Sequence, residues 1–342
     1  MKQHLNTLYV STQGAYLAKD GEAVAVRIEK KVRLRLPLHN LDGIVCFGRV
    51  GASPSLLAAC AEAGVSVSFM SIYGKMQARV LGFTSGNVLL RRQQYRMSDS
   101  PEASLGIARS MIAAKIANCR TTLLRSARDT KNPEKEASLR DASDRLKRNL
   151  FNASRAESLD SLRGIEGESA SAYFSAFNAM LIDDTNLSLN GRTRRPPQDP
   201  VNAMLSFLYV MLSHDIRSAC ESVGLDSQVG FLHRDRPGRP SLALDLMEEF
   251  RPVLVDRYVI TLINRKQVSQ SDFESQPSGG IVMKDAARRE LLKGWQERKQ
   301  EPMLHEFVNE KVSLGLFVHL QARLLARHIR GDLDAYPPCF WK

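Results

Sequence analysis

The chain has 342 residues, of which 43% are hydrophobic and 25% charged, enough for an ordinary soluble core in one large domain or two. No stretch approaches the ~20 uncharged apolar residues of a membrane helix, and the first twenty residues lack the apolar run of a secretory signal. We therefore expect a cytoplasmic protein with no membrane segment. Lys and Arg number 48 against 37 Asp and Glu, a net charge of +11, which favours nucleic acid over other partners, although a basic enzyme of another kind has the same balance.

Short alternating or β-branched runs occupy the chain up to about residue 90. Strands are expected at 8–11, 23–28, 32–36, 65–70 and 77–81, and one helix at 53–63. The five cysteines are scattered and form no CxxC pair, which argues against a zinc knuckle or a disulfide framework. This part of the sequence predicts a small β-rich N-terminal domain, residues 1–90.

From Ser100 the hydrophobic period becomes helical. Ser100, Pro101 and Glu102 are typical of a helix start, and apolar residues then recur every three or four positions, while Lys115 and several arginines are assigned to the solvated remainder of that helix. Further helices are expected after a loop within 129–150, from Asp199 towards 224, and at 241–250, 283–299 and 304–330. The fold class is therefore α+β, with 91–100 as a linker, within the bridging segment 83–100, and 101–342 as an all-α domain.

The stretch GIEGESASAYF, residues 164–174, places an acid at the expected start of an apolar helix. Glu166 lies four residues before Ala170, at the head of the apolar stripe, where the helix dipole would favour a carboxylate. The chain contains no P-loop, GxSxG or HExxH motif, so the common nucleotide, hydrolase and zincin sites lack support. This glutamate is either an ordinary helix start or the first ligand of a metal site.

A second acid-bearing segment is GFLHRDRPGRPSLALDLMEEFRP, residues 230–252. His233 precedes a loop with three arginines, Arg234, Arg236 and Arg239, and Ser241 is positioned to cap the helix that follows. Three acids of this helix share one side over a single turn: Asp245, Glu248 and Glu249. With His233 they offer mixed nitrogen and oxygen ligands that suit Mg²⁺ or Mn²⁺, although acid clusters on helices are more often simply solvated.

These two segments, the helix DPVNAMLSFLYVML and the order of the domains resemble the CRISPR-associated integrase family, with subtype I-C as the nearest match. The resemblance covers nearly the whole chain. It implies that a divalent metal, Mg²⁺ or Mn²⁺, is bound by Glu166, His233 and Glu248, which are also the catalytic residues. Asp245 matches a further acidic position of the family, and the choice between Glu248 and Glu249 stays open, although spacing favours Glu248. Asn202 and Tyr209 match the central helix of the family and would line the DNA site.

The resemblance also implies the reaction and the partners. A DNA 3′-hydroxyl would attack a phosphodiester at the repeat boundary of a CRISPR array by transesterification, with Arg234, Arg236 and Arg239 as candidates to hold phosphates. The partners implied are double-stranded DNA, a second copy of the chain in a homodimer, and a small companion adaptation protein; the β-rich domain would serve dimerisation and contact DNA ends. Two alternatives remain: a non-catalytic basic DNA-binding scaffold, and a branched-DNA repair nuclease without integration. Glu168, two residues after Glu166, points to another side of the helix and is expected to be dispensable for the chemistry.

Overall fold

The computed structural model describes residues 6–341 apart from 73, 75, 81, 83–87, 194–195 and 278. Residue 81 of the expected strand 77–81 and residues 83–87 of the expected bridging segment lie outside the described residues. The chain divides into two compact units. The first comprises Met1–Gly86, Arg288–Glu301 and Ser313–Leu316, and the second comprises Asn87–Ala287, Pro302–Val312 and Phe317–Lys342.

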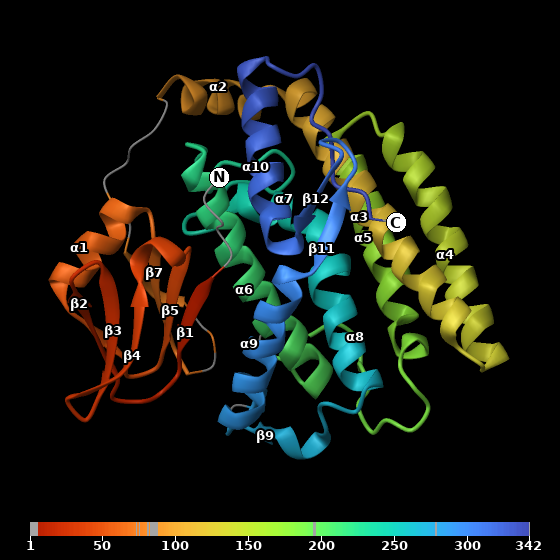
Figure 1. Ribbon diagram of the computed structural model, residues 1–342. Coiled ribbons are helices and arrows are strands. Elements are labelled where there is room, and N and C mark those ends of the chain that lie inside the picture. Colours follow the sequence, from red (N-terminus) through yellow and green to blue (C-terminus); the bar gives the residue numbers. More distant parts are fainter. Residues whose placement is uncertain are drawn as a thin grey trace. The chain divides into compact units, whose positions relative to one another are not determined.

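Two four-stranded sheets form the β-rich unit (Figure 1). One sheet has the order β1-β5-β7-β8, in which β1, β5 and β7 are parallel and β8 is antiparallel to β7. The other has the order β4-β3-β2-β6, with β2, β3 and β4 antiparallel and β6 parallel to β2. The strands are β1 (Thr7–Val10), β2 (Tyr16–Asp20), β3 (Ala23–Ile28), β4 (Lys31–Pro37), β5 (Gly43–Phe47), β6 (Gly51–Ala52), β7 (Ser66–Met70) and β8 (Met76–Val80).

The core of this unit lies between the sheets and the helix α1 (Pro54–Ala63). Fully buried aliphatic side chains from different strands meet there, among them Leu17, Val24 and Ile44. α1 begins where the Ser53 hydroxyl accepts the N–H of Leu56 and ends at Gly64, whose φ of 71° is left-handed. The strands and helix predicted for this region are therefore present.

A distant piece of the chain completes the same unit. The helix α9 (Asp285–Gln300) lies more than 200 residues after β8, and most of it, from Arg288 on, belongs here. Gln296 Nε2 donates to the Thr7 carbonyl at 2.7 Å, and the Arg288 guanidinium lies 5.9 Å from the centroid of the Phe47 ring. The N-terminal unit is thus not contiguous in sequence.

The second unit is mainly helical (Figure 1). Its helices are α2 (Val88–Asp99), α3 (Pro101–Asp129), α4 (Pro133–Ser154), α5 (Leu159–Ser175), α6 (Pro200–Ser222), α7 (Ser241–Phe250), α8 (Arg257–Asn264) and most of α10 (Leu314–Arg330). A π-helical stretch, Arg251–Asp256, joins α7 to α8, and short 3₁₀ turns occur at Leu38–Asn40 in the first unit and at Phe177–Met180 and Gln270–Asp272 in the second. A β-rich region followed by a mostly helical one is what the sequence predicts, so the α+β class is confirmed.

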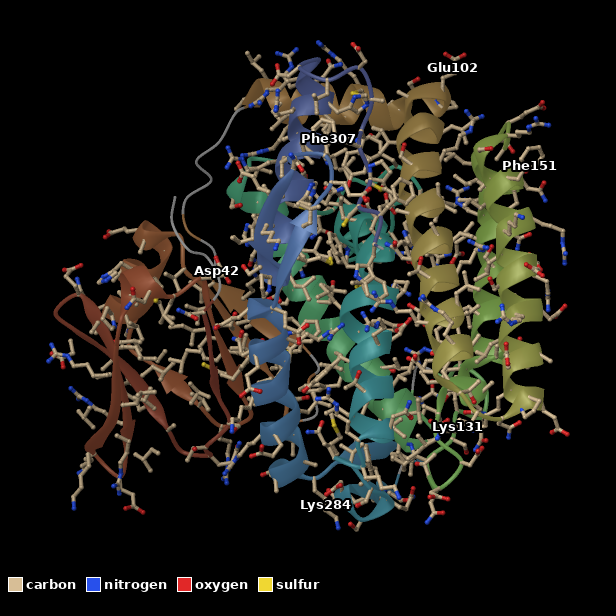
Figure 2. All side chains as sticks on the ribbon, turned by 45° about the vertical axis from the view of Figure 1, so that its right-hand side comes forward. Asp42, Glu102, Lys131, Phe151, Lys284 and Phe307 are labelled. Carbon is tan, nitrogen blue, oxygen red and sulfur yellow. The ribbon has the colours of Figure 1, made fainter. Side chains whose placement is uncertain are left out.

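The 29-residue helix α3 packs against α4, α5 and α7. Its start is as predicted: the Ser100 hydroxyl accepts the N–H of Ala103, with Pro101 in the first turn. Figure 2 shows Glu102 at one end of this helix and Lys131 just beyond the other, an arrangement of charges that complements the helix dipole. Because α3 contacts both α5 and α7, side chains from the two predicted acidic segments can meet on its surface.

Several expectations differ from the structure. Residues 91–99 of the expected linker are helical, within α2, and the helical region also contains two short two-stranded sheets, β9 (Phe273–Ser275) with β10 (Ile281–Met283) and β11 (Pro302–His305) with β12 (Glu310–Ser313). The helix expected at 304–330 begins only at Leu314, because Asn309 adopts a left-handed φ of 53° and turns the chain between two strands. In the part of the chain that the structure describes, no helix is both long and apolar enough to cross a membrane.

Candidate metal and DNA site

Two acids predicted as metal ligands meet at a single lysine of α3. The Lys115 ammonium forms ion pairs with Glu166 Oε1 from α5 and, at 2.7 Å, with Glu248 Oε2 from α7. The Lys115 side chain is 9% exposed and that of Glu248 is 4% exposed, whereas Glu166 is partly open at 27%. Three helices far apart in sequence therefore bring two carboxylates to one buried cation.

Glu248 is a strongly ionised buried acid. Burial alone would raise its pKa, but the charges of Arg251 and Lys115 outweigh burial and lower the pKa to about 2. Arg251 Nη2 lies 3.2 Å from Glu248 Oε1, one turn along the chain. On the other side of the carboxylate, Glu248 Oε2 lies 2.7 Å from the Lys115 ammonium, so each oxygen of Glu248 faces a cation.

Asp245 forms hydrogen bonds to the loop that carries His233. Its Oδ2 accepts the N–H groups of Phe231 and Leu232 at 2.6 and 3.0 Å, and its Oδ1 accepts the N–H of His233 at 3.0 Å. Asp245 Oδ1 also lies 2.5 Å from His233 Nδ1. A neutral imidazole that donates from Nδ1 keeps its lone pair on Nε2, so Asp245 orients His233 as a carboxylate orients a metal-binding histidine.

Gly230 and Arg163 also fix the position of this loop. A Cβ at Gly230 would lie 2.6 Å from Asp245 Oδ2, so only glycine allows the backbone to approach this carboxylate. Arg163 of α5 donates to the Leu232 carbonyl from Nε at 2.9 Å and from Nη2 at 2.6 Å. α5 therefore fixes the histidine loop as well as supplying Glu166.

Glu249 is held apart from these groups. Its Oε1 accepts the Tyr336 hydroxyl at 2.6 Å, and its Oε2 accepts Gln321 Nε2 at 3.0 Å and the Cys339 N–H at 2.8 Å. Burial raises the pKa of Glu249 to about 7, although these three hydrogen bonds lower it. Glu249 thus anchors the C-terminal segment, and the three acids predicted to share one side of the helix do not act together.

Asn202 and Tyr209 belong to a neighbouring polar network. Asn202 accepts Arg192 Nη1 at 2.6 Å and donates to the Gly191 carbonyl at 2.7 Å, which fixes the loop before α6. The Tyr209 hydroxyl donates to Asp256 Oδ1 at 2.5 Å, and its ring lies beneath two guanidinium groups, Arg251 at 4.9 Å and Arg192 at 5.3 Å from its centroid. Both residues are therefore part of a hydrogen-bonded network and not isolated surface side chains.

The three arginines after His233 lie in the loop between that residue and α7. Arg234 and Arg236 are exposed and Arg239 is half-buried. Arg234 Nη2 pairs with Asp160 Oδ1 of α5 at 3.0 Å. Ser241 does not cap α7: the capping position is Pro240, and the Ser241 hydroxyl instead donates to the Arg234 carbonyl at 3.3 Å. The serine follows a proline that already fixes the entry to the helix, and its hydroxyl is directed back to the loop.

Two expectations about these residues are wrong. α5 begins at Leu159 behind the Ser158 cap, so Glu166 lies two turns inside the helix and not at its start, and the helix dipole does not favour it. Lys115 was assigned to a solvated face, yet it is buried. The sequence does indicate this burial, because Lys115 follows Ala108, Met111 and Ile112 at the spacing of the apolar stripe. Arg251, three residues after Glu248, also escaped notice.

The donors at this place suit a divalent cation. Among the described residues, no three His, Cys, Asp or Glu side chains lie together in an arrangement that would hold a metal ion. However, Glu166 and Glu248 already share one cation, and Asp245 of α7 orients His233 through the contact at Nδ1. Two carboxylates and an oriented imidazole are ligands that Mg²⁺ or Mn²⁺ accepts.

A hollow of about 670 Å³ elsewhere in the helical unit is distinct from these groups. It lies where the end of α3 and the start of α4 face α8, and it is lined mainly by polar and charged side chains. None of the acids described above lines it, so its size does not mark the place where the carboxylates converge.

The two-part fold, a β-rich unit and a mainly helical one, occurs in solved structures of other proteins. A CAS1 protein from Thermotoga maritima has the same fold: the TM-score is 0.82 at 24% identity, covering 95% of this chain and 97% of that one. A Cas6-RT-Cas1–Cas2 complex contains a chain of which 36% matches all of this one, with a TM-score of 0.83 and 25% identity.

The family model described as CRISPR associated protein Cas1 matches residues 8–297. A relative in Chlorobaculum tepidum, named CRISPR-associated endonuclease Cas1 1, is 50% identical over 345 residues, which span all of both chains. This chain belongs to the Cas1 family, so the resemblance found in the sequence is confirmed.

Proposed function

We propose that this protein is a metal-dependent DNA endonuclease and integrase of CRISPR adaptation. It joins the 3′-hydroxyl ends of captured DNA fragments to the repeat boundaries of a CRISPR array by transesterification. The proposal is supported by the relative in Chlorobaculum tepidum, which is 50% identical over all of both chains and is named an endonuclease. The observation that carries the proposal is the convergence of Glu166 and Glu248, from α5 and α7, on one buried cation.

The ligands proposed for Mg²⁺ or Mn²⁺ are Glu166, His233 and Glu248, which are then also the catalytic residues. When bound, the metal would lower the cost of charge on the attacking oxygen and on the phosphate under attack. Asp245 supports His233 through the contact at its Nδ1, and Arg251 balances the second oxygen of Glu248. Glu249 is assigned to the C-terminal segment instead.

Phosphate contacts are proposed for the loop after His233. Arg234, Arg236 and Arg239 follow the proposed metal-binding histidine directly, so guanidinium groups would hold the DNA backbone beside the reacting phosphate. Asn202 and Tyr209 are proposed to act on DNA through Arg192. The Arg192 guanidinium donates a hydrogen bond to Asn202 and lies over the ring of Tyr209.

The proposed partners are double-stranded DNA, a second copy of this chain and a small companion protein. A matching structure is described as a complex of Cas1 with Cas2, which supports a companion. The β-rich unit is proposed to serve dimerisation and contact with DNA ends. The protein would work in the cytoplasm, where a CRISPR array is accessible, and the assignment to subtype I-C remains a prediction.

An integration assay tests this function. The purified protein, with and without the companion, is incubated with Mn²⁺, a CRISPR plasmid and short duplexes bearing 3′-hydroxyls. Wild type is expected to give joined products, whereas Glu166→Ala and His233→Ala lose them by at least about 100-fold while keeping DNA binding. Glu168→Ala is the matched control, because Glu168 lies two residues from Glu166 on the same helix and pairs with Arg145 at 3.0 Å on its exposed side.

Three other results would change the proposed site or function. Normal joining by Glu166→Ala and His233→Ala would show that the site is assigned to the wrong residues. Metal-independent DNA binding by wild type without any joining would make the protein a scaffold. Cutting of branched DNA without joining would make it a repair nuclease.

A further inference from the structure

Lys115 is a buried cation at the point where the proposed metal site requires one. It is 7% exposed as a residue, and its ammonium pairs with both Glu166 and Glu248. The three charges come from α3, α5 and α7, whose mutual packing fixes their positions. No motif of the sequence assigns a function to this lysine.

Electrostatics explains why a cation is needed there. Two carboxylates in a poorly hydrated place repel each other, and removing the partner of a buried charge leaves that charge uncompensated. Arg251 balances one oxygen of Glu248 from the far side, at 3.2 Å, but no described contact joins it to Glu166. Among the described residues, Lys115 forms ion pairs with both acids, so it keeps them together before a metal arrives.

A divalent cation and the ammonium cannot both occupy the space between the same two oxygens. Lysine is suited to yield, because its charge is a compact group on a flexible four-carbon stem that can turn away without moving the helix. A metal bound by Glu166 and Glu248 would then take over the charge balance that the ammonium provides.

We propose that Lys115 is an internal counter-cation that competes with the divalent metal: it holds Glu166 and Glu248 in the metal-free protein and is displaced on metal binding. This inference rests on the metal site of the proposed function. Lys115 is therefore a positioning residue, which preserves the ligand geometry of the metal-free protein at the cost of weaker metal binding.

The test compares Mn²⁺ binding and thermal unfolding of wild type and Lys115→Met. The dissociation constant for Mn²⁺, from calorimetry or from the paramagnetic resonance signal of free Mn²⁺, is expected to fall about tenfold, equivalent to ~1.4 kcal/mol. Without metal, the variant should unfold roughly 5–10 °C below wild type, and saturating Mn²⁺ should remove most of this difference.

Lys135→Met is the matched control. Lys135 Nζ of α4 is also paired, with Asp183 Oδ1 at 2.6 Å, and its side chain is 21% exposed. This variant should lose thermal stability equally with and without Mn²⁺, and its Mn²⁺ affinity should equal that of wild type. Lys115→Gln serves as a second variant in case Lys115→Met does not fold without metal.

The results separate this inference from the function on which it rests. If Mn²⁺ does not bind wild type, the proposed metal site itself is wrong. If Mn²⁺ binds wild type but Lys115→Met has unchanged or weaker affinity, the competition is refuted while the metal site stands. Variants that fold only in Mn²⁺ support the proposal, whereas variants that fail to fold even in Mn²⁺ overturn it, because the metal then does not replace the ammonium.

Discussion

At the scale of single residues, burial and neighbouring charge decide what each acid does. Asp256, 1% exposed at the end of the π-helical stretch, accepts the Tyr209 hydroxyl at 2.5 Å. Burial raises its pKa to about 6, although the Tyr209 hydrogen bond and the charges of Arg251 and Arg192 lower it. Glu248 is equally buried but has a pKa of about 2, because Arg251 and Lys115 lie against its carboxylate. Composition and spacing contain nothing that separates these two acids.

Asp256 should make stability depend on pH in a definite direction. Its pKa of about 6 in the folded protein exceeds the usual 3.8, so the folded state binds more protons between these values. The contribution to the free energy of unfolding is complete below about pH 4 and is lost as pH rises through 6, by about 3 kcal/mol. Asp256→Asn retains an acceptor for Tyr209 but cannot ionise.

Urea unfolding of wild type and Asp256→Asn between pH 4 and 7.5 checks this. The stability of wild type relative to the variant should fall across that range and level off above pH 7. A difference that stays constant with pH would mean that Asp256 is ionised throughout, with Tyr209 and the arginines outweighing burial.

At the scale of elements, α7 shows how one short helix serves several parts of the protein. Nine of its ten residues are buried, including all three acids. Asp245 holds the histidine loop, and Glu248 contacts Lys115. Glu249 holds α10 through Gln321 and the segment after α10 through Tyr336 and Cys339. The predicted cluster of three acids is therefore divided among three tasks, because a buried helix has neighbours on every side.

Glu249→Gln should destabilise the protein. Above about pH 8 Glu249 is ionised and accepts hydrogen bonds from all three partners, so the amide of glutamine would place an N–H against one of them and leave a buried donor without an acceptor. We expect the free energy of unfolding to fall by about 1–3 kcal/mol in denaturant titrations. Glu168→Gln, an exposed change on α5, should have little effect. Equal stability of the two variants would contradict the role given to the C-terminal segment.

At the scale of the whole molecule, sequence order and compact units do not coincide. The β-rich unit includes residues 288–301, whose side chains Leu291, Leu292 and Trp295 are at most 3% exposed. The pattern of the first 90 residues predicts α1 and five of the described strands, but not β2, β5 or β6. It cannot show that a helix from the last quarter of the chain belongs to the same unit, because helical periodicity identifies an apolar face but not what covers it.

A fragment of residues 1–86 is therefore expected to fold poorly alone. Without α9 the contact at Thr7 and the cation–π contact at Phe47 are lost, and apolar surface is left exposed. Adding a peptide of residues 285–301 in trans should restore near-native circular dichroism and a cooperative thermal transition. A peptide with Leu291→Asp and Trp295→Asp is the matched control, and a fragment that unfolds cooperatively without any peptide would refute this dependence.

The residues proposed for the site were accessible from the sequence to different degrees. Glu166, His233 and Glu248 are predicted from the family resemblance of their segments, and spacing favours Glu248 over Glu249. Lys115 and Arg251 were missed, because a lysine on a helix is usually solvated and an arginine after two glutamates suggests only a local ion pair. The role of Asp245 towards His233 could not be deduced, because it depends on three backbone N–H groups converging on one side chain.

The α+β class, most of the helices, five strands of the β-rich unit, the basic character of the chain and its family follow from the sequence alone. These follow from local periodicity, capping residues and short segments, all of which depend on neighbours within a few positions along the chain. Three arrangements are visible only in the folded protein: Lys115 pairs with both Glu166 and Glu248, Glu249 contacts the C-terminal segment, and most of α9 belongs to the β-rich unit. Those arrangements depend on which helices pack against one another, and the free energy of such packing comes from contacts between residues that are distant in the sequence.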